Sequence, residues 1–134
     1  MIGIEQLAQR IERLATPAPM AAVSRSMATT AIALFQTGFA ARTNPYSNRW
    51  AQRVKSVPWP ILERTGYLRA SGELEAVSAE GFRLHVYAPY AWFHQHGTAR
   101  MVSRKVVPDA VAGLGAWQRP LELAARNTFL GYLN

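Results

Sequence analysis

The segments ILERTGYL (residues 61–68) and YAWFHQHG (residues 90–97) enclose the part of the chain that decides its fold. Each segment carries apolar or aromatic residues followed by a glycine, Gly66 in the first and Gly97 in the second. Glycine adopts a positive φ without steric cost, and this is the conformation that commonly ends a helix. The sequence therefore predicts a short helical turn over 61–65, closed by Gly66, and another over 89–96, closed by Gly97.

The residues between these segments alternate apolar and polar side chains in two short runs, 73–78 and 82–87. Alternation with a period of two is typical of strands with one covered face. The connecting residues 79–81 end in glycine, which suits a tight turn. We therefore predict an antiparallel β-hairpin, with a further strand over 101–107 through Val102 and Val106.

Apolar side chains recur at helical spacing on both sides of this region. The first predicted helix covers residues 4–15, and its apolar face consists of Ile4, Leu7, Ile11 and Leu14. Prolines at positions 17 and 19 end it, a longer helix follows over about 20–41, and a closing helix starts near residue 117. The predicted fold class is α+β: N-terminal helices and a C-terminal helix packed with a small antiparallel sheet, made of the hairpin and the further strand.

The length of 134 residues suits a single domain over 1–134. We divide it into N-terminal helices (1–41), a basic loop (42–60), the sheet with its short helices (61–108) and the C-terminal helix (116–134). The chain has no cysteine, which excludes disulfides, thiolate zinc sites and cysteine nucleophiles. No apolar run approaches the roughly 18–20 residues that a membrane helix needs, so we expect no membrane association.

The formal net charge is +7, and thirteen of the fifteen basic residues are arginine. Arginine is favoured where planar, bidentate contacts to carboxylate or phosphate are made. The charge is also uneven, because residues 42–69 hold six basic residues against Glu63 alone, and residues 81–107 hold four and no acid. This one-sided charge indicates a partner-binding surface without naming the partner.

The basic loop 42–60 has no clear period, so it is either functional or ordered only by a partner, and we expect it to be poorly ordered in the isolated subunit. Arginines are interleaved there with Tyr46, Trp50 and Trp59, whereas Trp92 and Trp117 lie in predicted elements and are expected in the core. Such a mixture suits either single-stranded nucleic acid or a protein interface, and the absence of a known nucleic-acid motif favours the protein interface. The candidate interface residues are Arg42, Tyr46, Arg49, Trp50, Arg53, Lys55, Trp59, Arg100, Arg104 and Lys105.

The sequence contains no pattern typical of catalysis or of a bound cofactor. A nucleophile would need a base within reach and an orienting group, and no serine has such a context. His94 and His96 are the only close histidine pair, but on a helical turn they diverge, and His85 is the only further ligand available for zinc. We therefore predict a non-enzymatic protein without cofactor or metal, and a small metal-dependent hydrolase is a distant third reading.

The glycine-containing segments resemble the phage virion-morphogenesis family, the small tail-completion proteins of Mu-like and related tailed phages. That family shows a segment of the form W…IL..TG.L..S, then YA.iHq.G, then a basic segment with proline. The first segment is matched here by Trp50 and residues 61–68, the second by Tyr90, Ala91, His94, Gln95 and Gly97, and the third by Arg104, Lys105 and Pro108. The chain departs from the pattern at His96, where the family more often has an aromatic residue, and at Val102, where it commonly has proline.

The resemblance implies a structural virion protein of a tailed phage or prophage, made in the host cytoplasm and located at the head–tail junction. Family members complete the tail or join it to the head, and related neck proteins form rings around the DNA channel. The implied partners are further copies of the chain, six by resemblance alone, and neck, tail-tube or head-connector proteins, with genomic DNA passing through the channel. It also implies a structural turn that packs against the sheet, made of Gly66, Tyr90, His94, Gln95 and Gly97. The alternative is a basic nucleic-acid-binding module.

Overall fold

The fold is α+β, as predicted, with helices packed against a two-stranded antiparallel sheet. The computed structural model describes residues 3–53, 62, 66–99, 101–109 and 112–132. Its elements, in chain order, are α1 (Ile4–Ala15), α2 (Pro17–Ala41), α3 (Tyr67–Ala70), β1 (Gly72–Ser78), β2 (Gly81–Val86), α4 (Ala91–His96), the 3-10 turn η1 (Gly115–Trp117) and α5 (Gln118–Gly131).

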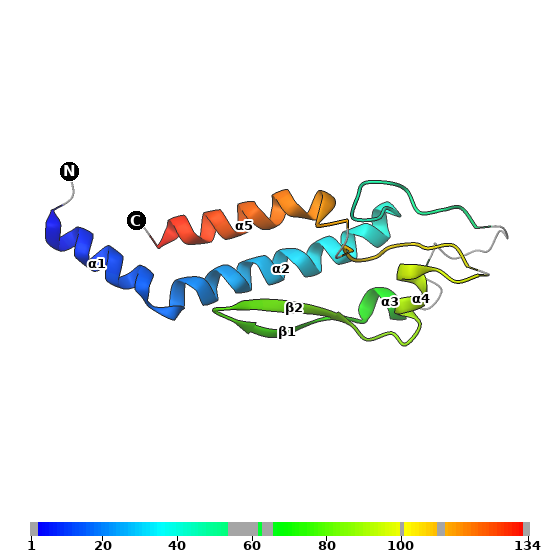
Figure 1. Cartoon of the computed structure of the whole chain (residues 1–134), viewed down its shortest axis with the longest axis horizontal. Coiled ribbons are helices and arrows are strands. Elements are labelled where there is room, and N and C mark those ends of the chain that lie inside the picture. The colour runs from blue at the N-terminus through cyan, green and yellow to red at the C-terminus, as the bar shows by residue number, and fades with distance from the viewer. Residues whose placement is uncertain (1–2, 54–61, 63–65, 100, 110–111, 133–134) are drawn as a thin grey trace.

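Helix α2 forms the axis of an elongated molecule (Figure 1). Helix α5 lies along one side of α2 and the β1–β2 hairpin lies along the other, and both pack directly on it. Pro17 occupies the first turn, where a missing N–H costs nothing, and Arg42 ends the helix in the left-handed conformation with φ 56°. The α2 helix predicted from residue 20 therefore begins three residues earlier and ends where expected.

The core is built around aromatic rings on the second half of α2. Phe35 and Phe39 are fully buried, and their rings meet edge to face at 5.2 Å. Phe39 meets the indole of Trp50 in the same way at 5.4 Å, which extends the core into the segment after α2. Trp117 and Leu121 bring the start of α5 into the same cluster. The closing helix was predicted from about residue 117, which agrees with α5 preceded by η1.

The hairpin approaches α2 closely because β1 begins with glycine. A Cβ atom at Gly72 would lie only 2.7 Å from the ring of Phe35. Gly72 pairs with Val86 and Leu74 with Leu84, and the register shifts between Glu75 and Ser78. This irregularity is a β-bulge, and it increases the local twist of the hairpin.

The further strand expected over 101–107 is wrong for the described residues, where the sheet has two strands and these residues run as an extended segment. Val102 and Val106 would share one face of a strand, yet Val102 is exposed and Val106 is buried. The backbone N–H groups of Arg104 and Val106 bond to α4 instead of to a neighbouring strand. A side chain and a helix end have therefore replaced the expected strand pairing.

Both glycines predicted to have positive φ do so, at 73° for Gly66 and 75° for Gly97. Gly97 follows the last residue of α4, as expected for a helix-closing glycine. Gly66 directly precedes α3, a short helix that the sequence did not predict. The helical turn predicted over 61–65 lies outside the described residues, apart from Leu62.

The tryptophans are distributed differently from the prediction. Trp117 is buried as expected, but Trp92 is 61% exposed and Trp50, expected on an exposed loop, is only 4% exposed. On the short helix α4, Ala91 and Gln95 face the interior, so Trp92 points outward. Trp50 is buried because its ring completes the row of aromatic contacts that begins at Phe35.

This difference between the two tryptophans gives a matched test of the core. We expect Trp50→Ala to lower the free energy of unfolding by about 3–5 kcal/mol, since it empties a large buried volume. We expect Trp92→Ala to change it by about 0.5 kcal/mol, because the indole is largely in solvent. Urea denaturation of both variants measures these values, and equal losses would contradict the placement of Trp50.

Candidate protein-interaction site

The buried amide of Gln95 holds the extended segment 103–107 against α4. Its Oε1 atom accepts hydrogen bonds from the backbone N–H groups of Val106 at 2.9 Å and Val107 at 3.3 Å. Its Nε2 atom donates to the carbonyl of Val107 at 2.8 Å. One side chain thus satisfies three backbone groups, as a neighbouring strand would.

The end of α4 adds two more bonds to this segment. The backbone N–H of Arg104 donates to the carbonyl of His94 at 2.7 Å, and the hydroxyl of Ser103 donates to the carbonyl of Gln95 at 2.7 Å. Gly97 allows the approach, because a Cβ there would lie 2.9 Å from the backbone nitrogen of Ser103. The predicted structural turn therefore packs on residues 103–107.

The basic segment after α2 is hydrogen-bonded to Arg104 and Lys105, in the extended segment beside α4. The indole Nε1 of Trp50 donates to the carbonyl of Lys105 at 2.9 Å. In return, the guanidinium of Arg104 donates to the carbonyls of Ala51 at 2.9 Å and Gln52 at 3.3 Å. Trp50 comes from the predicted basic loop, whereas Arg104 and Lys105 come from the segment after α4, and the structure brings the two segments together as internal packing.

Tyr46 and Lys105 are also engaged inside the molecule. The hydroxyl of Tyr46 accepts from the backbone N–H of Asp109 at 2.8 Å and donates to the carbonyl of Gly113 at 2.7 Å. Lys105 forms an ion pair with Asp109 at 2.6 Å, and this hydrogen bond raises the pKa of Lys105. These contacts join Tyr46 to Asp109 and Gly113, and Lys105 to Asp109.

The expectation that 42–60 is poorly ordered in the isolated subunit is therefore wrong for 42–53, which have these internal partners. Arg42 and Arg49 are exposed on this segment and Arg53 is half-buried. The remaining candidates, Lys55, Trp59 and Arg100, lie outside the described residues.

Exposed aromatic side chains gather where α3 and α4 meet. We define this aromatic patch as Tyr67, Tyr90, Trp92 and Phe93, all of which are exposed. The ring of Tyr67 lies 6.2 Å from that of Tyr90, and the ring of Trp92 lies 5.8 Å from that of Phe93. Because Ala91 and Gln95 take the inner face of α4, Trp92 and Phe93 lie on its outer face.

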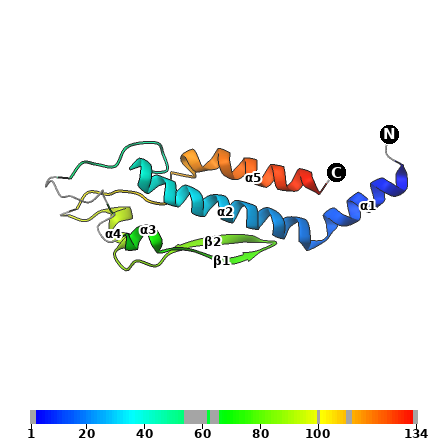
Figure 2. The same cartoon turned by 180° about the vertical axis from the view of Figure 1, so that it is seen from behind.

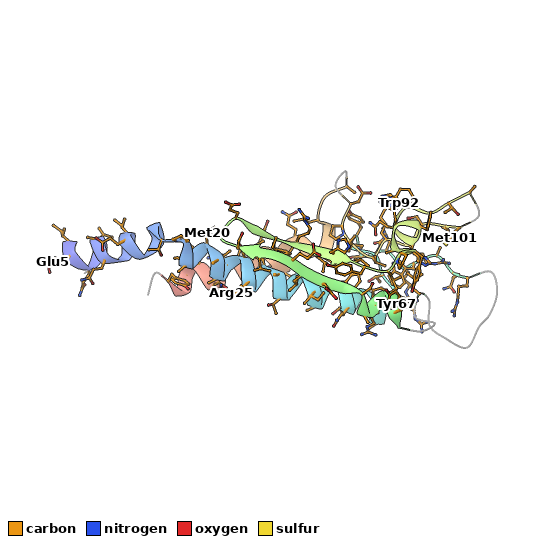
Figure 3. All side chains as sticks on the ribbon, turned by 90° about the horizontal axis from the view of Figure 1, so that it is seen from below. Glu5, Met20, Arg25, Tyr67, Trp92 and Met101 are labelled. Carbon is orange, nitrogen blue, oxygen red and sulfur yellow. The ribbon has the colours of Figure 1, made fainter. Side chains whose placement is uncertain are left out.

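A second uncovered apolar surface lies on α1. We define the apolar stripe as Ile4, Leu7 and Ile11, which are 88%, 51% and 57% exposed. Helix α1 leaves α2 at Thr16, whose extended conformation is required before Pro17, and it projects away from the other elements (Figures 1 and 2). Figure 3 shows Glu5 at one end of the molecule and Tyr67, Trp92 and Met101 at the other.

The histidines diverge, as the helical reading of 89–96 predicts. The ring of His94 meets that of Tyr90 at 5.6 Å, whereas the ring of His96 stacks on Trp92 at 4.4 Å. Within the part of the chain that the structure describes, no three histidine, cysteine or acidic residues are grouped to hold a metal ion. In that same part, no helix has the length and apolar character needed to cross a bilayer.

A shallow groove of about 280 Å³ lies between β2 and α5. Its lining is apolar and includes Phe82, Leu84, Leu114, Trp117 and Leu121. A substrate site normally adds a few convergent polar groups that orient the ligand, and these lining residues supply none from their side chains except the indole N–H. The groove therefore gives no support to a catalytic role.

Comparisons with protein-family models, with curated proteins and with solved structures gave no match for this chain. The site is thus defined by its own geometry: an internal hydrogen-bonded junction and two uncovered apolar surfaces at opposite ends.

The aromatic patch was missed because a six-residue helix is too short to show a period. The available signal was the spacing of Ala91 and Gln95, a small residue and an amide at i and i+4 within a run of rings. That pair marks the inner face, and it assigns the larger aromatic side chains to the outer face.

Gly97 and Gly66 provide a matched test of the junction. Both have positive φ, so alanine at either position costs about 1–2 kcal/mol in backbone strain. A Cβ at Gly66 meets open space, but at Gly97 it meets the backbone of Ser103 and Met101. We expect Gly97→Ala to be the more destabilising by at least about 1 kcal/mol in chemical denaturation. Equal losses would contradict the close approach of 101–103 to α4.

His94 gives the fold a pH dependence. Burial lowers the pKa of His94 below its usual value, and the positive charge of Arg104 lowers this pKa further. The unfolded chain, in which the pKa of histidine is about 6.5, therefore binds the proton first as the pH falls, and stability decreases. We expect the loss of unfolding free energy between pH 7.5 and pH 5 to be smaller in His94→Gln than in the wild type. Identical losses would contradict this assignment.

Proposed function

We propose that this chain is a structural virion protein of a tailed bacteriophage or prophage, a tail-completion or head–tail connector component that works by ring assembly and protein–protein contacts. It would be made in the host cytoplasm and act at the head–tail junction, beside neck, tail-tube or head-connector proteins. This role needs no catalytic residue and no cofactor.

The observation that carries the proposal is the pair of uncovered apolar surfaces at opposite ends of the molecule. Scattered exposed apolar residues are normal, but contiguous apolar surfaces mark interaction sites. The aromatic patch joins two tyrosines, a tryptophan and a phenylalanine, and aromatic residues are enriched at the centres of interfaces. In an assembly, neighbouring subunits at the two ends of each subunit would bury both the apolar stripe and the aromatic patch.

The assignment to phages is supported by the places where the three motif segments meet. Trp50 belongs to the first segment, Gln95 and Gly97 to the second, and Arg104 and Lys105 to the third. These residues contact one another through the bonds of Trp50 to Lys105 and of Gln95 to the segment after Arg104. The residues that match the three motif segments also form one structural junction. This shared junction would explain why the three segments recur together.

A nucleic-acid-binding module is the second candidate, favoured by the net charge of +7 and by exposed Arg42 and Arg49. Two groups expected to serve it are engaged elsewhere, since Trp50 is buried and Arg104 donates to backbone carbonyls. Stacking on single strands requires exposed rings beside cationic groups. The engagement of Trp50 and Arg104 counts against this candidate, whereas the exposed rings of the aromatic patch stay available to it.

Deletion of the gene from its phage tests the proposed function. We expect separate heads and tails to accumulate and infectious particles to be lost, because a missing connector prevents joining. Electron microscopy of lysates counts these particles, and a plasmid copy of the gene is the control that should restore virions. Normal virions from the deletion would contradict the assembly role and leave the nucleic-acid reading as the better one.

A further inference from the structure

The apolar stripe of α1 and the aromatic patch cannot cover each other within one chain. Helix α2 separates them, and its 25 residues span about 37 Å at 1.5 Å per residue. Helix α1 has 12 residues and spans about 18 Å, so even folded back along α2 it would end far from α4. The two surfaces therefore do not cover each other within one chain.

The charges of the chain permit a second copy as the partner of each surface. The four charged residues of α1, two glutamates and two arginines, cancel, so the whole formal net charge of +7 belongs to the rest of the molecule. Two such bodies repel each other, but α1 can approach a body without net repulsion. Glu5 and Glu12, seven residues apart, lie on one flank of the apolar stripe.

The end of the molecule that carries the aromatic patch is cationic. Arg69 lies on α3 with Tyr67, and Arg42 and Arg49 are exposed on the segment that follows α2 at the same end (Figure 1). The acidic flank of the apolar stripe is complementary in charge to Arg69, Arg42 and Arg49, which lie at the end that carries the aromatic patch. The rings also supply rigid contact area, which limits the entropy lost on binding.

We propose that the apolar stripe of α1 in one copy packs on the aromatic patch of the next copy, in a head-to-tail contact. This inference rests on the proposed assembly function and names the surfaces by which copies join. The contact is heterologous, since the two surfaces differ, and such a contact forms a ring when its rotation closes.

Two single substitutions on these surfaces test the contact. Leu7→Ser interrupts the apolar stripe and Trp92→Ser interrupts the aromatic patch, and both side chains are exposed, so the fold should be retained. Native mass spectrometry of the full chain should show assemblies for the wild type. Each variant should dissociate at least about tenfold more readily. Leu123→Ser, at an exposed site on α5, is the matched control and should assemble like the wild type.

Mixing the two variants distinguishes this contact from others. A Trp92→Ser chain keeps an intact α1 and a Leu7→Ser chain keeps an intact aromatic patch, so an equimolar mixture should form heterodimers and no larger species. The proposal is overturned if the mixture stays monomeric, if Trp92→Ser assembles like the wild type, or if the wild type is monomeric throughout. The mixing experiment tests the contact between copies, and the gene deletion tests the role in virion assembly. The two proposals can therefore fail separately.

Discussion

The close contact between the ring of Phe35 and the backbone of Gly72 sets the arrangement of the whole molecule. Because Gly72 has no side chain, the hairpin can lie directly on α2 at this point. Phe35 then meets Phe39, Phe39 meets Trp50, and the indole of Trp50 bonds to the carbonyl of Lys105. This single row of contacts links the sheet, the axis helix, the basic segment and the extended segment beside α4.

The row of contacts also decides which residues are left for partners. It draws Trp50 inward, and with it Arg104, whose guanidinium bonds to the carbonyls that follow Trp50. Tyr46 and Lys105 are held in the same region by Asp109. The arginine-rich composition thus serves internal order as well as surface charge. The apolar stripe on α1 and the outer face of α4 remain uncovered.

The sequence predicted the elements whose signals are local. The helices α1, α2 and α5 follow from periodic apolar residues, and the hairpin follows from alternation around the turn before Gly81. The positive φ of Gly66 and Gly97 followed from the same kind of reasoning, since few other residues adopt it freely.

The features that sequence reasoning missed depend on contacts between distant residues. Residues 101–107 have strand-like composition, but the amide of Gln95 binds the backbone of this segment in place of a neighbouring strand. The burial of Trp50 depends on Phe39, which lies on α2. No sequence signal links these two residues. The outward direction of Trp92 depends on which face of a six-residue helix meets the core. Tertiary packing, rather than local pattern, determines each of these.

We propose that this chain is the subunit of a closed ring, joined end to end by α1 and the aromatic patch. Electron microscopy of the purified full chain at increasing concentration tests this proposal. We expect closed rings of one diameter, with a helix of each subunit lying against the α4 end of the next. Particles that remain single elongated subunits at every concentration, or that join through the sides of α2, would contradict it.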